Sequence, residues 1–262
     1  MTDRYEFGLA LVQEAGKVAL GYFNARDQLT IQNKGPQDLA SEADVNTELL
    51  IRDRLAKAFP QDAFLGEETP PTEYTAGQGI WVVDPIDGTR AFINHSKDWA
   101  HALAVVEDGL VISAVVYLPM HDLMFAATKD GGATVNDQPI AVTNAAVGDA
   151  TVLGAKPNFE ARFWKDGDVP AVERAFRSSL AYRLCLVAQG QFDGMITLRP
   201  SWEWDIAAGA LIISEAGGVV SDQHAAPLRF NNPHPQVPGV LAAGAQLHAA
   251  LAARLEPQPA NT

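Results

Sequence analysis

The sequence predicts an α/β fold, of the layered α+β kind, in which helices and strands pack around a shared core. Amphipathic helical spacing comes first, in residues 3–24 and again after Ser41. A block of β-type segments follows from about residue 63 to 135, and further helices come only after it. Elements in blocks of one type favour layered α and β over the strict alternation of a Rossmann or barrel order.

The helices of the first block have clear sequence signals. Apolar side chains such as Leu11 and Ala15 recur at helical spacing over residues 3–24, which predicts an amphipathic helix. A short strand and a Gly-Pro loop are expected in LTIQNKGPQD, residues 29–38. Ser41-Glu42-Ala43-Asp44 then matches a capping box, with Asp44 in the place usually given to Glu or Gln, so a second helix is expected up to Pro60.

The remaining elements follow from alternation, turn residues and helix ends. Strands are expected in AFLGEE (63–68), GIWVV (79–83), two segments of 101–119, parts of 122–136, ATVLGA (150–155) and DGMITL (193–198). Helices are expected near 170–176, in SSLAYRLCLVAQG (178–190), and in DIAAGALIISEAGG (205–218) with glycines at its C-cap. The Pro-rich residues 227–238 are expected to form an ordered surface loop before a short last helix.

Composition limits the class of partner. The 262 residues are 47% hydrophobic and 19% charged, as in ordinary globular proteins, and the net charge is −13. A nucleic-acid partner is not expected, because binding a polyanion needs a basic face. An anionic ligand would need another source of positive charge, and metal ions supply it.

Single features point to a cytoplasmic protein. The one cysteine, Cys185, excludes an internal disulfide and a cysteine-based zinc cluster, and its apolar neighbours predict burial. No signal-peptide pattern and no 18-residue apolar run is found, so no membrane association is expected.

Acidic residues gather in four places where helices or strands are predicted to begin or end: Asp38 with Asp44, Glu67 with Glu68, Asp84 with Asp87, and Asp205. Each has an ordinary alternative. Asp44 fits a capping-box acid, Asp205 an N-cap, and Glu68 a solvated acid. The residues 84–89, Asp-Pro-Ile-Asp-Gly-Thr, are also the usual vocabulary of a turn.

Taken together, the acids predict a metal site. Glu67, Asp84, Asp87 and Asp205 in one crevice would repel one another unless protons or cations neutralised them. Oxygen ligands without a His or Cys cluster favour Mg²⁺. The six histidines have no zinc-site spacing, and neither a P-loop nor a nucleophile elbow is present. Gly-Thr after the second aspartate offers N–H groups and a hydroxyl to a phosphate.

Three motifs, GEE (66–68), DPIDGTRAF (84–92) and WDIAAGALIISEAGG (204–218), stand in an order that resembles the inositol monophosphatase family of Mg²⁺-dependent, lithium-sensitive phosphatases. That family belongs to a superfamily that includes fructose-1,6-bisphosphatase. The resemblance implies an αβαβα five-layer sandwich, usually homodimeric. It implies a single domain over residues 1–262, with a metal-binding half at about 1–140 and a second half at about 150–262.

The resemblance also implies two or three Mg²⁺ ions. Glu67, Asp84 and the carbonyl of Ile86 would hold the first ion. Asp84, Asp87 and Asp205 would hold the second, and a weaker third would reach Glu67 through water. Metal ions held in this way clamp the phosphoryl oxygens and activate a water for in-line attack without a covalent intermediate.

Further roles are implied around this centre. Gly88 and Thr89 would bind the phosphate beside Asp87 and Asp205, and Thr89 with Asp44 would orient or deprotonate the attacking water, with Glu67 as a further catalytic residue. In a separate loop, Lys34 and Asp38 would lie near a mobile segment that closes over the metals.

The substrate's alcohol is less defined. The animal-type inositol enzymes of the family have an acid seven positions before the last metal-binding aspartate, whereas this chain has Leu198. Arg183 and Arg199 could meet a second anionic group, or form surface salt bridges; Trp202 and Trp204 could stack on a base or simply pack. A small phosphate monoester of the inositol-1-phosphate type is the family expectation. The alternatives are a 3′(2′),5′-bisphosphate nucleotide, histidinol phosphate, or a regulatory role in binding the RNA machinery.

Overall fold

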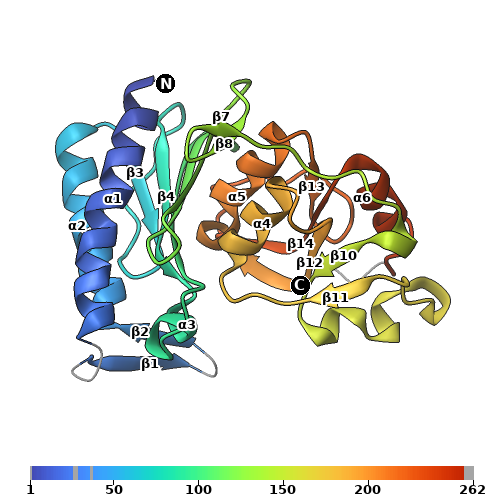
Figure 1. Cartoon of the computed structure of the whole chain (residues 1–262). Coiled ribbons are helices and arrows are strands. Elements are labelled where there is room, and N and C mark those ends of the chain that lie inside the picture. Colours follow the sequence, from blue (N-terminus) through green and yellow to red (C-terminus); the bar gives the residue numbers. More distant parts are fainter. Residues whose placement is uncertain (1, 26–28, 36–37, 257–262) are drawn as a thin grey trace.

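The computed structural model describes residues 2–25, 29–35 and 38–256, and these residues stack in five layers (Figure 1). The order is two helices, a large sheet, two buried helices, a smaller sheet and a last helix. The αβαβα sandwich implied by the resemblance is therefore confirmed. The division into halves near residues 140–150 is not tested and stays a prediction. Among the described helices, none is long and apolar enough to cross a bilayer.

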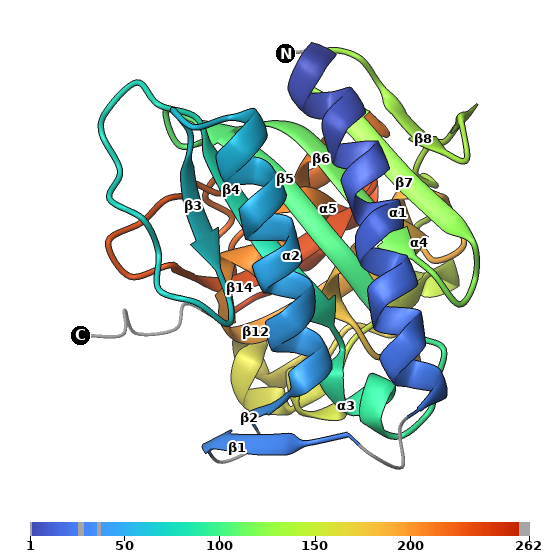
Figure 2. The same cartoon turned by 90° about the vertical axis from the view of Figure 1, so that its left-hand side faces the viewer.

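Helices α1 (Thr2–Asn24) and α2 (Glu42–Ala58) form the outer layer on one face of the large sheet (Figures 1 and 2). Both predicted helices are confirmed. Leu11 and Ile51 from these helices pack with Trp81 and Val83 of the sheet. The two-residue period of a strand places these two sheet residues on the same face. Burial of this apolar face holds the helices to the sheet.

The large sheet has seven strands in the order β3-β4-β5-β6-β7-β8-β9, and only the β3–β4 pair is parallel. Their bounds are β3 (Ala63–Gly66), β4 (Ile80–Asp87), β5 (Ala100–Glu107), β6 (Leu110–Leu118), β7 (Leu123–Thr128), β8 (Ala133–Val135) and β9 (Gln138–Pro139). The predicted strands of this block are confirmed. A separate hairpin pairs β1 (Ile31–Gly35) with β2 (Asp38–Ser41), and Pro36 and Gln37 of the predicted Gly-Pro loop lie outside the described residues.

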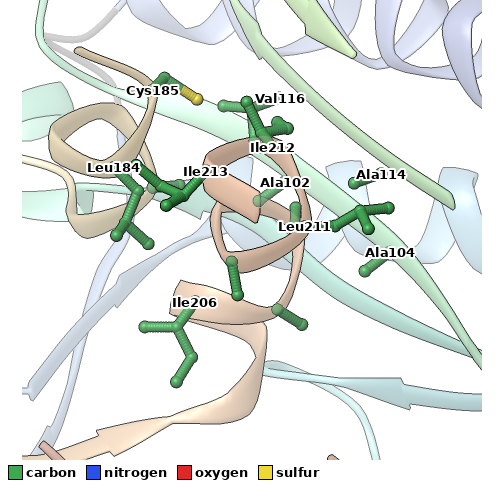
Figure 3. Packing of buried hydrophobic residues seen from close by; sticks show 14 of the residues in the cluster. Ala102, Ala104, Ala114, Val116, Leu184, Cys185, Ile206, Leu211, Ile212 and Ile213 are labelled. Atoms are coloured by element: carbon green, nitrogen blue, oxygen red, sulfur yellow. The ribbon is translucent and has the colours of Figure 1, made fainter. Parts of the chain in front are cut away.

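The middle layer consists of α4 (Leu180–Ala188) and α5 (Glu203–Glu215). Figure 3 shows Leu211 and Ile212 of α5 directed at Ala104 and Val116 of the large sheet. Leu184 of α4 lies on another side of α5. Helix α5 is buried along almost its whole length, which explains why its sequence has no polar face.

The last two layers are the five-stranded sheet β11-β10-β12-β14-β13 and helix α6 (Ala245–Ala252). The strands are β10 (Thr151–Leu153), β11 (Glu173–Ala175), β12 (Gly194–Trp202), β13 (Val219–Ser221) and β14 (Gln236–Ala243). Short 3₁₀ turns occur at Val147–Asp149, Lys156–Phe159, Ala161–Phe163 and Lys165–Gly167.

Two expectations for this half are wrong. The helix expected near 170–176 is instead the edge strand β11, which pairs with β10 in parallel. The Pro-rich loop stops earlier than expected, because β14 begins at Gln236 and joins β12 and β13. Long-range pairing decides both cases, and local sequence does not report it.

We expect the substitution Gly209→Ala to destabilise the protein. A Cβ built at Gly209 would lie 2.5 Å from Leu184 Cδ1 and 2.6 Å from its Cβ, so α4 and α5 would have to move apart. Overpacking of this kind typically costs about 1–3 kcal/mol. Gly21→Ala in α1 is the matched control, because nothing lies within 4 Å of its Cβ position apart from its chain neighbours and the backbone of its own helix. The control should gain up to about 1 kcal/mol from helix propensity. Urea unfolding of both variants measures this, and a stable Gly209→Ala protein would contradict the close contact.

Candidate metal centre

The DPID residues form the C-terminal end of β4, all of which is buried. Pairing with β5 shifts between Asp84 and Asp87, so that β4 contains one extra residue, a β-bulge. The Ile86 N–H donates to Asp84 Oδ1 at 2.9 Å. His101 Nδ1, on β5, donates to the Pro85 carbonyl oxygen. The turn expected at residues 84–89 is therefore corrected in part: residues 84–87 are the bulged end of a strand, and the chain turns at Gly88.

Glycine is required directly after this strand. Gly88 has φ of 101° and is the N-cap of the short helix α3 (Thr89–Ile93). A Cβ there would lie 3.1 Å from the Asp98 carbonyl oxygen, in a region of φ that other residues rarely adopt. The backbone thus turns sharply at Gly88 and brings Thr89 back beside the strand.

Asp44 joins the second helix to this turn. It lies in the first turn of α2, and its Oδ2 accepts the Ser41 N–H at 2.7 Å, which confirms the capping box. Its other oxygen, Oδ1, accepts the Thr89 hydroxyl at 2.9 Å. The two alternatives for Asp44, helix cap or site residue, are therefore compatible, because each uses a different oxygen.

Asp84, Asp87 and Asp205 form a carboxylate cluster, with one oxygen from each lying within 4.8 Å of the others. Asp84 and Asp87 are buried, and Asp205 is half-buried. Asp205 is the third residue of α5, whereas Trp202 occupies the N-cap. The N-cap alternative for Asp205 is therefore wrong, and its carboxyl group is available to the cluster.

Ser179 is a site residue that sequence reasoning missed. Its hydroxyl donates to Asp87 Oδ2 at 2.6 Å, and the Ala181 N–H donates to the same oxygen at 2.6 Å. Ser179 is also the N-cap of α4, where its Oγ accepts the Tyr182 N–H. A serine directly before an apolar helix is a readable N-cap signal, but nothing local indicates that it also holds a carboxylate.

Ionisation of Asp84 and Asp205 is unfavourable without a cation. The pKa of Asp84 is raised well above its usual range, first by burial and then by the negative charges of Glu67, Asp87 and Asp205. Burial and the charge of Asp87 raise the pKa of Asp205 to about 8. Glu67, which follows β3, is thus close enough for its charge to act on Asp84, although it lies outside the 4.8 Å cluster.

A divalent cation would suit these residues. The donors are all oxygens, and they are buried close together with more negative than positive charge around them. Hard cations such as Mg²⁺ prefer such donors and remove their mutual repulsion. The fit therefore supports a metal centre at the meeting point of β4 and α5.

Arg183 and Arg199 are two positive residues that act on the cluster. The charges of both oppose the rise in the pKa of Asp205, and Arg183 acts on Asp87 as well. Arg183 is held by a 2.6 Å hydrogen bond from Nε to the Arg177 carbonyl and lies over the Phe176 ring. Arg199 is exposed. Neither arginine forms one of the salt bridges found among the described residues.

The residues near the expected alcohol position are packed. Leu198 is only 8% exposed and packs with the apolar residues between the smaller sheet and α6. Trp202 and Trp204 stack on each other with ring centroids 4.8 Å apart. Trp204 belongs to the main core, which supports packing as its role.

Other expected residues are less informative. Lys34 lies on β1 and Asp38 begins β2, and their side chains lie outside what the structure describes. The mobile loop therefore stays a prediction. Glu68 is half-buried, so it is partly exposed to solvent, and its role stays a prediction. Cys185 is buried and free, as expected.

Comparison with known proteins agrees with this arrangement. A family model described as the inositol monophosphatase family matches residues 1–260. The chain belongs to the inositol monophosphatase family. The structure is similar to that of the Thermotoga maritima IMPase, with a TM-score of 0.83 and 26% identity, covering 96% of each chain.

The curated relatives have two kinds of name. The chain is 35% identical over 226 residues to an inositol-1-monophosphatase of Rhizobium meliloti, covering 80% of this chain and 82% of the relative. It is 34% identical over 220 residues to the Nus factor SuhB of Escherichia coli K12, covering 80% and 81%. Family membership is therefore established, and similarity to named relatives does not choose between these two descriptions.

We expect the metal-free protein to lose stability as the pH rises. Asp205 has a folded pKa of about 8 against an ordinary value of 3.8, so between these values the folded state holds a proton that the unfolded state has released. The free energy of unfolding therefore falls over this window. In Asp205→Asn, the free energy of unfolding should fall less steeply with pH. At pH 8 the variant should have a Tm a few degrees above that of the wild type, because about 1 kcal/mol corresponds to 2–4 °C.

Thermal unfolding in chelator from pH 5 to pH 8.5 measures this, with Asp166→Asn on an exposed turn as the control. Adding Mg²⁺ should raise the Tm of the wild type and of the control at pH 8, but not that of Asp205→Asn. Equal pH slopes in all three proteins would contradict the prediction.

Proposed function

We propose that this protein is a Mg²⁺-dependent phosphomonoesterase that hydrolyses a small phosphorylated alcohol. The observation that carries the proposal is the carboxylate cluster of Asp84, Asp87 and Asp205 beside the hydrogen-bonded pair Thr89–Asp44. Bound Mg²⁺ ions would hold the phosphoryl oxygens and make a water molecule acidic enough to attack. Glu67 and the carbonyl of Ile86 would complete the ligand set.

The protein's own groups would orient the attacking water. Thr89 gives its hydroxyl hydrogen to Asp44, which leaves the lone pairs of Thr89 Oγ1 to accept a hydrogen from water. Burial raises the pKa of Asp44, while the hydrogen bonds from Ser41 and Thr89 act in the opposite direction. A carboxylate balanced in this way suits the acceptance of the proton that leaves the water.

The phosphate would meet the chain at Gly88 and Thr89. The left-handed backbone at Gly88 starts α3, and the first N–H groups of a helix have no partner within it. These groups would receive the phosphate oxygens beside Asp87 and Asp205. Water would attack phosphorus and pass a proton to Asp44, the bond to the ester oxygen would break, and the departing alkoxide would take a proton from solvent. This direct attack would need no covalent intermediate.

Two arginines favour a second candidate substrate class. Leu198 is packed away in the core, so it offers no acceptor to a polyol, whereas Arg183 and Arg199 act electrostatically on Asp87 and Asp205. A substrate with a second anionic group, such as a 3′(2′),5′-bisphosphate nucleotide, would match these charges better than inositol 1-phosphate. Histidinol phosphate is less well matched, because its amine is cationic.

A regulatory role is the alternative from another class. Relatives named Nus factor are as similar to this chain as relatives named inositol-1-monophosphatase. The net charge of −13 argues against direct binding of a nucleic-acid backbone, but not against binding a protein of the RNA machinery. Measured turnover of phosphate esters separates the two functions, which similarity to relatives does not.

We expect Asp84→Asn to abolish phosphate release while the protein remains folded. Loss of a carboxylate that would hold the metal should lower kcat by about 10³-fold or more. Phosphate release with Mg²⁺ measures this, alongside circular dichroism and the exposed control Asp166→Asn. Chelator should have the same effect on the wild type, and millimolar lithium should inhibit it. Retained turnover in Asp84→Asn would contradict the metal assignment.

Thr89→Ala tests the water-orienting pair separately from the metals. Because only the positioning and proton path of the water are lost, kcat should fall by about 10²-fold with little change in KM or in Mg²⁺ affinity. Thr89→Ser keeps the hydroxyl and should retain most of the activity. A Thr89→Ala enzyme with wild-type kcat would remove threonine from the mechanism.

The substrate class is tested by kcat/KM with Mg²⁺ for inositol 1-phosphate, histidinol phosphate, 3′-phosphoadenosine 5′-phosphate and fructose 1,6-bisphosphate. We expect Arg199→Gln to lower kcat/KM for the bisphosphates by about fivefold, as for loss of one exposed ion pair, and to leave inositol 1-phosphate unchanged. No turnover of any ester, together with capture of RNA polymerase or ribosomal components in a pull-down, would favour the regulatory alternative.

A further inference from the structure

The loop that carries Glu67 is built around a buried carboxylate from another element. Glu48 lies on α2 and is 0% exposed. Its Oε2 accepts the Glu68 N–H at 2.9 Å, and its Oε1 accepts the Thr69 N–H at 2.7 Å. Both oxygens of Glu48 are therefore used by the backbone directly after Glu67.

The backbone before Glu67, at Gly66, also lies close to the Glu48 carboxylate. A Cβ built at Gly66 would lie 2.6 Å from the carboxylate carbon and from both oxygens of Glu48. Glycine at this position lets the chain pass directly over the carboxylate. The backbone on both sides of Glu67 is thus in contact with one side chain.

Helix α2 holds this loop with a second residue. Arg52, four residues after Glu48, donates to Thr69 Oγ1 at 2.6 Å and to the Pro70 carbonyl at 2.8 Å. Asp44, four residues before Glu48, accepts from Thr89. Residues four apart lie on one face of a helix, so one face of α2 contacts both the Glu67 loop and the turn after β4.

Burial of the Glu48 carboxylate without a positive partner is costly, so it calls for a structural explanation. No salt bridge to Glu48 occurs among the described residues, and its partners are backbone N–H groups. An apolar residue of similar size would avoid the desolvation of a charge. Only a carboxylate presents an acceptor to two N–H groups at once, because an amide would turn its NH₂ towards one of them.

We propose that Glu48 is a positioning residue for the divalent-cation site, which fixes the backbone on both sides of Glu67 and so directs the Glu67 carboxylate towards Asp84. Glu48 itself contacts neither substrate nor cation. The inference rests on the proposed function, because it assumes that Glu67 is a metal ligand. It assigns a role in metal affinity to a helix residue outside the three recognised motifs.

The test compares Glu48→Gln with Glu215→Gln. Glu215, at the far end of α5, is a matched control because its oxygens also accept two loop N–H groups, from Asp130 at 2.9 Å and Gly132 at 2.8 Å. Mg²⁺ alone is titrated into each full-length protein by calorimetry, and Tm is measured with and without Mg²⁺. Glu48→Gln should raise the Kd for Mg²⁺ by about tenfold, as for other residues that orient metal ligands, while Glu215→Gln stays within about twofold of wild type.

An unchanged Kd in a folded Glu48→Gln protein would overturn the inference. If that variant does not fold, Arg52→Met decides, since Arg52 is half-buried and holds the same loop. It should raise the Kd by about threefold, and an unchanged value would again overturn the inference. A wild type that binds Mg²⁺ but hydrolyses no ester would refute the proposed function alone, whereas a wild type that binds no Mg²⁺ would refute both.

Discussion

The mutual repulsion of buried carboxyl groups is the constraint on which the rest of this structure depends. Asp84 and Asp87, both on β4, lie within a few ångströms of Asp205, which comes from α5 far along the chain. Left to themselves, these groups would separate or take up protons. The apolar layers on either side of the large sheet supply the stability that keeps them together.

Different helices make the polar contacts around the cluster. Asp87 is held by the start of α4, and Thr89 is held by Asp44 at the start of α2. Two helix N-termini thus meet one bulged strand end. The N–H groups at the start of α4 also moderate the negative charge of the site, because their hydrogen bonds lower the pKa of Asp87.

Much of this could be predicted from the sequence, and the exceptions have a common cause. The capping box, the motif order and the amphipathic α1 are local signals, and the structure has all three features. The strand β11 and the site role of Ser179 depend on partners far along the chain, which no local pattern encodes. The contacts of Glu48 and His101 could not be predicted either, because each side chain supports a backbone segment that is distant in sequence.

The substrate alcohol is hard to predict for a different reason. The sequence shows that Leu198 departs from the family pattern. Whether its side chain faces the site or the core depends on its packing against α6. From the sequence, Arg183 and Arg199 can be identified only as positive residues. Their electrostatic effect on Asp205 is seen only when the folded structure brings β12 and α4 together. The acids of the carboxylate cluster are therefore found from motifs, whereas the surroundings of Leu198, Arg183 and Arg199 become clear only in the folded chain.

The burial of α5 has a mechanical consequence. This helix carries Asp205, is enclosed between the two sheets, and touches α4 at Gly209 without room for a methyl group. Asp205 therefore cannot shift without moving the centre of the molecule. On the opposite side, by contrast, the short helix α3 and the described part of the hairpin β1–β2 lie at the periphery (Figure 1). The position of Asp205 is thus fixed by the packing of the most enclosed helix, whereas Thr89 belongs to a short helix near the edge of the fold.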